Sequence, residues 1–545
     1  MHEHPGHEWW RTAVFYQLYP RSFQDSNGDG VGDLDGITRR LDYLNDGTRA
    51  SLGIDAVWLS PTFPSPMKDF GYDVSDYTGV DPVFGDMAAM ERLIAACHDR
   101  GIRVLLDFVP NHTSDQHPWF IESRTSRTSA RRDWYVWRDP LPGGGLPNNW
   151  VSAFGGPAWT FDEATGQYYL HSFLREQPDL NWRNHEVEAA MHDVLRTWLD
   201  RGVDGFRIDV MGMVLKHPDL ADNPPNPEWS EGHSDYRQFL WTNNRNYPDV
   251  YGAVRGIRRV LDEYKERMAV GEVFGTPAEI ANYYGGEALD GLHLAFNFQF
   301  IHESDLRGGF SAWDAPTIRR IIAASEEGLP PGAQPCWAFG SHDRPRFISR
   351  HNSDGRGDER ARAAALILLG LRGSPFIYYG EEIGMVDQLE IPEERRQDPA
   401  RHHSIWRDPA RTPMQWDASP GRGFSRATPW LPFGPADISV AAQEHDPDSM
   451  LSLYRDAIWL RRQERALLEG SLELLPANDL TVAFIRRAPG ARPVLVALNT
   501  TGGTTTLPMP QPGRVIIATE RTLDSSLAGS LLRLPPFSAA WVALE

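Results

Sequence analysis

The stretch VDGFRIDV, residues 203–210, alternates between apolar and polar side chains as a β-strand does. Phe206, Ile208 and Val210 would share one face of the strand, because strand side chains have a period of two. Arg207 and Asp209 would lie on the other face. A positive charge beside an Asp favours its ionised form. Such an Asp can act as a nucleophile or a metal ligand, although the Arg-x-Asp pattern alone is more typical of a structural ion pair.

Segments with the pattern of a strand recur along the chain and mostly alternate with segments that have the pattern of a helix. Strands are predicted at residues 12–20, 54–60, 103–110, 203–210, 269–274, 292–297, 336–340 and 375–379, and helices at 35–44, 86–100, 186–201, 254–268 and 360–371. Strands that alternate with helices form parallel βαβ units. Eight such strands predict an α/β fold, a closed (β/α)8 TIM barrel.

Two segments depart from this order. Residues 113–170 are rich in Trp, Gly, Pro and Asn, and a long irregular insertion in a compact domain is usually functional. After about residue 466, short alternating runs follow one another without helices, which predicts an antiparallel β-sandwich. We therefore expect a barrel domain at 1–112 and 171–465, an inserted loop-rich domain at 113–170, and a C-terminal β domain at 466–545.

The composition limits the classes of partner. The chain has 545 residues, of which 41% are hydrophobic, and 74 Asp and Glu against 54 Lys and Arg give a formal charge of −20. This charge disfavours nucleic acids and anionic membranes as partners. No apolar run reaches the length of a membrane-spanning helix, and the first residues lack the apolar core of a signal peptide, so we expect a cytoplasmic protein. The two cysteines, Cys97 and Cys336, imply no disulfide framework.

The loop DSNGDGVGD at residues 25–33 has the pattern of a calcium-binding loop. Its predicted ligands are the side chains of Asp25, Asn27, Asp29 and Asp33 and the carbonyl of Val31. Residue 36, where an EF-hand has its bidentate Glu, is a glycine. The pattern therefore favours a structural Ca²⁺ site over a calcium sensor; Mg²⁺, or a turn without a metal, is the alternative.

Polar residues follow four of the predicted strands. They are Asp107 with Asn111-His112, Arg207 with Asp209, Glu272, and His342-Asp343. In such barrels the carboxyl ends of the strands meet at one mouth, where the reactive residues lie. Two carboxylates in different environments, one kept ionised by Arg207 and one pushed toward protonation by its neighbours, are the minimal equipment for cleaving a glycoside.

Taken together, these motifs resemble glycoside hydrolase family 13, the α-amylase family, and within it the bacterial α-glucosidase and oligo-1,6-glucosidase branch. The motifs that carry the resemblance are DFVPNH (107–112), QPDLNW (177–182), GFRIDV (205–210), GEVF (271–274), FGSHD (339–343) and RTPMQW (411–416). The match spans essentially the whole chain. It departs from the branch at Ser341 and Arg344, where Asn and Gln are frequent.

The resemblance implies a role for each matched residue. Asp209 would be the nucleophile, Glu272 the general acid and base, and Asp343 the residue that holds the 2- and 3-hydroxyls. The predicted substrate-binding residues are His112, Arg207 and His342 around the bound glucose, Phe154, Phe173 and Gln177 along the pocket, and Asp73 with Arg407 at the 4-hydroxyl of a terminal glucose. An Asp73–Arg407 pair would close the pocket beyond the first sugar and so give exo-action.

The resemblance thus predicts a retaining exo-acting α-glucosidase that releases terminal glucose from short α-1,4- or α-1,6-linked oligosaccharides, with Ca²⁺ and no organic cofactor. Val210, directly after Asp209, resembles the α-1,6-cleaving members, unless it only packs the barrel. The alternatives are a transglucosylating relative, such as a trehalose synthase or a sucrose-active enzyme, and a non-catalytic binding relative, which the retained acids disfavour. A monomer or small homo-oligomer is expected.

Overall fold

The computed structural model of the chain describes residues 8–231, 233, 235–301, 312–402, 406–476 and 478–545. The first seven residues, on which the expectation about a signal peptide rests, lie outside these ranges. Within them, no helix is both long enough and apolar enough to cross a membrane.

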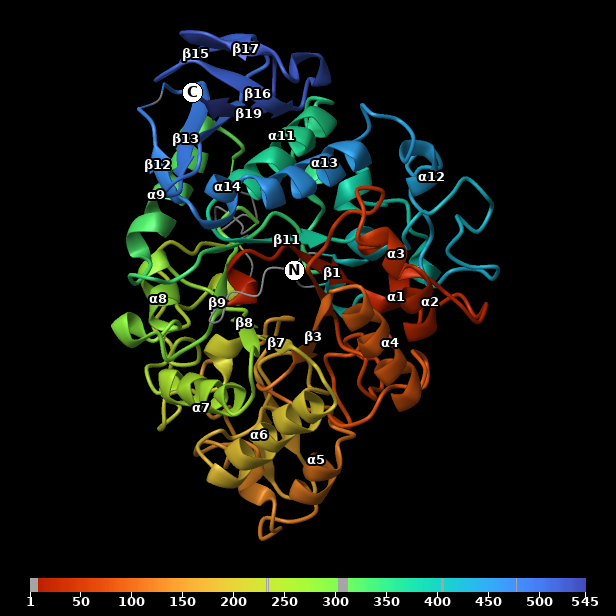
Figure 1. Cartoon of the computed structure of the whole chain (residues 1–545). Helices are drawn as coiled ribbons and strands as arrows, with labels where there is room; N and C mark the ends of the chain where they lie inside the picture. Colours follow the sequence, from red (N-terminus) through yellow and green to blue (C-terminus); the bar gives the residue numbers. More distant parts are fainter. Residues whose placement is uncertain (1–7, 232, 234, 302–311, 403–405, 477) are drawn as a thin grey trace.

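Eight parallel strands close into a barrel (Figure 1), which confirms the predicted fold class. They are β1 (Phe15–Leu18), β2 (Ala56–Leu59), β3 (Arg103–Phe108), β7 (Gly205–Ile208), β8 (Met268–Gly271), β9 (Leu294–Asn297), β10 (Cys336–Ala338) and β11 (Ser374–Tyr378). Each strand pairs with the next one listed, and β11 pairs back with β1. Their carboxyl ends therefore meet at one mouth.

Helices surround these strands (Figure 1). They are α1 (Pro20–Phe23), α2 (Leu34–Arg39), α3 (Leu41–Leu44), α4 (Met87–Asp99), α6 (His185–Asp200), α7 (Val250–Asp262), α8 (Pro277–Asn282), α9 (Ala315–Gly328), α10 (Phe347–Arg350) and α11 (Gly357–Gly370). Asp86, Asn184 and Asp314 cap the amino ends of α4, α6 and α9 by accepting backbone N–H bonds.

The helix predicted at 254–268 lies several residues earlier. It runs over Val250–Asp262 as α7, and the chain then turns through Glu266, whose φ of 56° is left-handed, into β8 at Met268. A helix cannot continue through a left-handed residue. The apolar pattern placed the helix correctly in the βα order but not its ends.

The inserted segment 113–170 contains a small antiparallel sheet in addition to its loops. Helix α5 (Pro118–Ser123) is followed by β4 (Trp137–Arg138), β5 (Trp159–Asp162) and β6 (Gln167–Leu170), in the sheet order β4-β6-β5. The aromatic residues of this insertion mostly pack together: Trp150 and Trp159 are buried in one cluster with Leu170. Phe173 and Gln177, which follow the insertion, lie beside His112 at the barrel mouth.

The C-terminal part is antiparallel, as predicted. Strands β12 (Ser471–Leu474), β13 (Thr481–Arg487), β14 (Val494–Asn499), β16 (Gly513–Ala518), β17 (Leu527–Ala528) and β19 (Ala539–Leu544) form one sheet, and β15 (Thr505–Pro508) pairs with β18 (Leu531–Leu534). Helices α12 (Val440–Gln443), α13 (Met450–Gln463) and α14 (Arg465–Glu469) lead into it. Figure 1 shows these strands against α11, where Trp541 donates to the carbonyl of Leu366 at 2.9 Å.

Candidate active site

The side chain of Arg207 lies at the centre of the barrel mouth and binds three carboxylates. Its Nη1 donates to Asp107 at 2.8 Å and to Asp209 at 2.7 Å, and its Nη2 donates to Glu272 at 2.5 Å. The barrel ladder places these groups: the amide of Asp209 donates to Phe108 and that of Glu272 to Ile208, each at 2.8 Å. The convergence predicted from the strand order is therefore observed.

The charges in this cluster oppose one another. Burial raises the pKa of Asp209 well above its ordinary value; Arg207 counteracts this rise, while Glu272 and Asp107 add to it. Burial likewise raises the pKa of Asp107 to about 6, against the effect of Arg207. The prediction that Arg207 keeps one carboxylate ionised and leaves another to be protonated is thus too simple, because one guanidinium is shared by three acids.

Val210 does not continue the strand, contrary to the prediction. Strand β7 ends at Ile208, and Val210 has φ 33° and ψ 46°, a left-handed conformation that is rare for a β-branched residue. Its side chain packs with Met213 and Trp241 and not with the barrel core. The turn also brings the amide of Val210 to Glu272 Oε2 at 3.2 Å. The strained residue therefore supports the carboxylate of Glu272.

Asp343 follows β10 and accepts bonds from two arginines. Arg411 Nη2 lies 3.0 Å and Arg407 Nη1 3.3 Å from its Oδ1, and His342 Nε2 lies 3.2 Å from its Oδ2. Burial raises the pKa of Asp343, whereas the guanidinium charges of Arg407 and Arg411 lower it, and the balance lies below the ordinary value. Asp343 is thus an anion at every pH of interest, with its side chain 32% exposed toward the pocket.

His342 is fixed from both sides. Gln17 Nε2 donates to its Nδ1 at 2.7 Å, so its Nε2 carries the proton, and the phenol oxygen of Tyr72 lies 2.8 Å from that nitrogen. The ring stacks on Tyr72 with an interplanar angle of 3°. Burial lowers the pKa of His342 well below its ordinary value, which keeps it neutral. It can therefore donate one hydrogen bond without adding a charge.

Asp69, and not Asp73, is the partner of Arg407. Arg407 Nη2 donates to Asp69 at 2.8 Å, whereas the carboxylate of Asp73 is fully buried and accepts bonds from Ser65 Oγ and from the amides of Lys68 and Asp69. The predicted Asp73–Arg407 pair is wrong because the chain between the two aspartates turns back on itself. Arg407 itself lies at the site, as predicted.

The remaining predicted pocket residues join this pair. Gln177 Nε2 donates to Asp69 at 3.1 Å and lies 3.0 Å from His112 Nε2. The ring of Phe173 lies 5.1 Å from His112 and 6.0 Å from Phe154, and the Arg407 guanidinium lies 5.3 Å from the Phe154 ring. Burial lowers the pKa of His112 to about 4. All of these residues therefore form one wall, which we call the Asp69–Arg407 wall.

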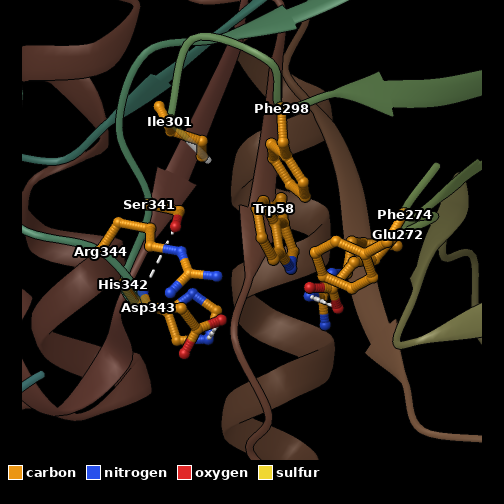
Figure 2. A pocket seen from close by; sticks show the side chains of 10 residues that line it. Trp58, Glu272, Phe274, Phe298, Ile301, Ser341, His342, Asp343 and Arg344 are labelled. Atoms are coloured by element: carbon orange, nitrogen blue, oxygen red, sulfur yellow. Dashed lines mark hydrogen bonds and ion pairs between the residues drawn. The ribbon is translucent and has the colours of Figure 1, made fainter. Parts of the chain in front are cut away.

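A cavity of about 320 Å³ opens between these groups (Figure 2). It is lined by Trp58, Arg207, Glu272, Phe274, Phe298, Ile301, Ser341, His342, Asp343 and Arg344. Figure 2 shows carboxylates at Glu272 and Asp343 on the two sides of Trp58, with the aromatic rings of Phe274 and Phe298 above them. This combination of apolar rings and a few fixed polar groups is typical of a small-molecule site.

Several contacts were not predicted. Tyr72 and Trp58 both donate to Asp107, at 2.9 and 3.1 Å. Arg407 donates to the carboxylate of Asp398 from its Nε, its Nη2 and its backbone N–H. Arg411 is the first residue of the motif at 411–416, but the motif did not predict its contact with Asp343. Tyr72 and Trp58 lie 35 and 49 residues from Asp107, and Asp398 lies nine residues from Arg407, so the folded backbone decides each contact.

Comparison with known proteins identifies the family. The model of the alpha-amylase catalytic domain matches residues 17–470. The chain belongs to the α-amylase family. It is 44% identical over 503 residues to a probable alpha-glucosidase of Rhizobium meliloti (strain 1021), covering 88% of each chain. It is 40% identical over 535 residues to an oligo-1,6-glucosidase of Heyndrickxia coagulans, covering 92% of this chain and 94% of that one.

A solved structure is similar to this α-amylase-family chain over nearly its full length. It is an alpha-glucosyl transfer enzyme, with a TM-score of 0.90, 38% identity, and coverage of 98% of this chain and 99% of that one. The resemblance predicted from the motifs is confirmed, and the chain is an enzyme of that family. Relatives of both the hydrolysing and the transferring kind are similar to it.

The predicted calcium loop of this α-amylase-family chain is closed by its own side chains. Asp25 accepts the amides of Asn27, Gly28 and Gly30, and Asp33 those of Ser26 and Gly36. Among the described residues, no group of three or more His, Cys, Asp and Glu side chains is arranged to hold a metal. The predicted set also uses an amide oxygen and a backbone carbonyl, so the Ca²⁺ site stays a prediction.

Proposed function

We propose that the chain is a retaining exo-acting α-glucosidase, which releases terminal α-linked glucose from short oligosaccharides. The observation that carries the proposal is the single guanidinium of Arg207, which binds both Asp209 and Glu272 at the barrel mouth. Because one side chain spans both, the two carboxylates are close neighbours. A close pair of carboxylates is what the retaining mechanism uses, with one as nucleophile and the other as acid and base.

In the first step, a carboxylate oxygen of Asp209 attacks the anomeric carbon from the β face of the sugar ring, opposite the α-linked leaving group. Glu272 gives its proton to the glycosidic oxygen, the bond to the leaving sugar breaks, and a β-glucosyl-enzyme remains. Arg207 stabilises Asp209 as an anion before attack and Glu272 as an anion after it has lost its proton. A shared guanidinium therefore suits a reaction in which negative charge moves from one acid to the other.

In the second step, Glu272 takes a proton from water, which attacks the anomeric carbon and displaces Asp209. Two inversions give net retention. Asp343, held as an anion by Arg411 and Arg407 and bonded to His342, would bind sugar hydroxyls beside the reacting carbon. His342 is neutral and its only ring proton points toward Tyr72 and Asp343, so it holds Asp343 in place without acting as a proton donor to the substrate.

The Asp69–Arg407 wall supports exo-action. In this proposal, the ion pair beside the cavity, with Gln177 bonded to Asp69, limits the space to one terminal sugar and presents charged groups to its 4-hydroxyl. A chain extended beyond that hydroxyl would have to displace the pair. Breaking a buried pair is costly because it leaves uncompensated charge.

Linkage preference falls to the residues around the second sugar. Val210, with its strained backbone next to Asp209, is the candidate that favours α-1,6-linked substrates. A panel of maltose, isomaltose, trehalose, sucrose and longer dextrins gives the preference of the wild type. We expect Val210→Thr to lower the kcat/KM ratio of isomaltose to maltose, whereas an unchanged ratio would remove Val210 from the determinants.

The second candidate function is glucosyl transfer to a sugar, which the similarity to an alpha-glucosyl transfer enzyme favours. It uses the same covalent intermediate and differs in whether water or a sugar reaches it. Product analysis separates the two: hydrolysis yields two glucose molecules per maltose, whereas transfer yields new disaccharides or longer products with less free glucose.

Truncation of Asp209 tests the assignment of the nucleophile. We expect Asp209→Ala to abolish hydrolysis of an aryl α-glucoside while its thermal unfolding stays cooperative. Activity retained by the folded variant contradicts the assignment of Asp209 as the nucleophile.

We also propose that the 25–33 loop binds Ca²⁺ through Asp25, Asn27, Asp29 and Asp33 and the Val31 carbonyl. All of these are hard oxygen donors of the kind that Ca²⁺ takes. The loop lies far along the chain from the carboxylates and is joined to residues near 425 by Ser425 Oγ, which donates to Asp25 at 2.5 Å. A bound ion there would stabilise this contact and take no part in catalysis.

A further inference from the structure

The loop at residues 64–73 carries two buried aspartates with different environments. Asp69 faces the Asp69–Arg407 wall and binds Arg407 and Gln177. Asp73 makes no bond to either; its oxygens accept three bonds from within the loop, from Ser65 Oγ and the amides of Lys68 and Asp69, each at 2.9 Å. By accepting these three hydrogen bonds, the carboxylate of Asp73 fixes the conformation of the loop around it.

The backbone of this loop is strained, so something must hold it. Met67 has φ 60° and Phe70 has φ 49°, left-handed values that cost energy for residues with a side chain, and Gly71 has φ 104°. At Gly71 a Cβ would lie 3.0 Å from the carbonyl oxygen of Pro61, a tight contact that adds to the strain of its left-handed φ for any residue with a side chain. Phe70 and Gly71 turn the chain between Asp69 and Asp73, and Met67 turns it just before Asp69. The bonds to Asp73 span these turns.

A hydrogen bond from the backbone N–H of Asp69 to the carboxylate of Asp73 couples the two residues directly. Asp73 Oδ1 accepts both the Asp69 amide and the Ser65 hydroxyl, so one oxygen ties the residue that binds Arg407 to the start of the loop. Tyr72, the residue before Asp73, donates its backbone N–H to the carbonyl of Asp69 at 3.2 Å. The position of the Asp69 side chain therefore depends on the buried carboxylate four residues later.

We infer that Asp73 is a positioning residue for terminal-glucose recognition: it holds the strained loop that presents Asp69 to Arg407. The inference rests on the proposed function, since it assigns Asp73 a part in that same site. Asn at this position offers one acceptor oxygen and turns an NH₂ group toward an N–H or O–H donor, so it cannot replace the carboxylate.

The test measures recognition of the 4-hydroxyl in place of overall activity. The substrates are an aryl α-glucoside and its 4-deoxy analogue, and the quantity is the ratio of their kcat/KM values. We expect Asp69→Asn to lower this ratio the most and Asp73→Asn to lower it by roughly tenfold, about the effect of one charged hydrogen bond. Turnover of the 4-deoxy analogue should change much less. The double variant should lose no more than Asp69→Asn alone, because both act on one contact.

Asp76→Asn is the matched control. Asp76 is an exposed acid three residues further on that bonds only to Thr78 within its own turn, and its substitution should leave the ratio unchanged. If Asp73→Asn does not fold, Ser65→Ala removes one of the three bonds and should lower the ratio by a smaller factor.

The outcomes separate the two proposals. A wild type without activity on the aryl glucoside contradicts the proposed function itself. A wild type that hydrolyses the glucoside and discriminates against the 4-deoxy analogue, together with an Asp73→Asn variant that loses rate equally on both substrates, overturns the role of Asp73, because a purely structural defect lowers the two rates alike. Losses that add in the double variant overturn it as well.

Discussion

Arg407 and Asp69 form an ion pair at 2.8 Å, although 338 residues separate them in the sequence. The pair lies beside the cavity, because the same guanidinium reaches Asp343, a lining residue, at 3.3 Å. In the proposed function, recognition of the terminal sugar and orientation of the carboxylate of Asp343 thus share one side chain. Changes at this pair should therefore affect substrate binding first and turnover second.

Removing the charge of Asp69 tests the wall. We expect Asp69→Asn to raise KM for maltose by ~10- to 100-fold, the size of a lost charge-assisted hydrogen bond, with a smaller fall in kcat. Longer dextrins should lose less than maltose, because the wall would no longer limit the space to one terminal sugar. Steady-state kinetics on maltose and a dextrin check this, and an equal loss on both substrates would contradict it.

Asp398 should set the direction of the Arg407 guanidinium. It binds Arg407 Nη2 at 2.7 Å and Nε at 3.0 Å, and without it the guanidinium is free to turn toward Asp343. We expect Asp398→Asn to lower kcat as well as raise KM, in contrast to Asp69→Asn. The exposed neighbour Glu394 provides the control, since Glu394→Gln should leave both constants unchanged. A pattern identical to that of Asp69→Asn would refute the separate role of Asp398.

The pH profile should reflect the crowding of carboxylates around Arg207. The reactive form of Asp209 is the anion, so kcat/KM falls as the pH drops through its pKa. Burial raises that pKa, which moves the acidic limb above the ~3.9 of an ordinary Asp. Asp107 raises it further, so Asp107→Asn should shift the limb to lower pH. A limb that stays in place or moves upward in the folded variant would contradict this account.

Calcium should stabilise the chain through the 25–33 loop. A ligand that binds the folded state raises the unfolding temperature in proportion to the logarithm of its concentration over Kd. We expect Tm to fall when EDTA is added and to return with Ca²⁺ more than with Mg²⁺, and Asp29→Asn to abolish this shift. Asp35→Asn, which removes only a surface pair with Arg92, should keep it. A Tm that does not respond to either ion would contradict the proposed site.

The sequence predicted the barrel and its mouth because both depend on local patterns. Apolar runs of strand length, each followed by a helical repeat, are legible one segment at a time, and parallel strands bring their carboxyl ends together whatever their loops do. Asp209 and Glu272 were therefore placed correctly from their positions at strand ends. The carboxyl end of β7 was not predicted correctly, because nothing in an alternating pattern indicates that Val210 adopts a left-handed conformation.

Long-range partners were not predictable in the same way. Asp69 and Asp73 lie in one short loop, and their spacing does not tell which of them faces the cavity; the left-handed Met67, Phe70 and Gly71 decide it. The contacts of Arg411 with Asp343 and of Asp398 with Arg407 likewise depend on the folded backbone. In each case, the residue type pointed to the chemistry, and only the folded chain supplied the partner.

The central claim is that Asp209 forms the covalent bond to glucose. A 5-fluoro-α-glucosyl fluoride should react to give a slowly hydrolysed glucosyl-enzyme, and mass spectrometry of the digested protein should find the label on the peptide that carries Asp209. The account predicts a label at Asp209 that is absent from Asp209→Ala. A label on another residue, or turnover of the wild type without any accumulated adduct on Asp209, would contradict it.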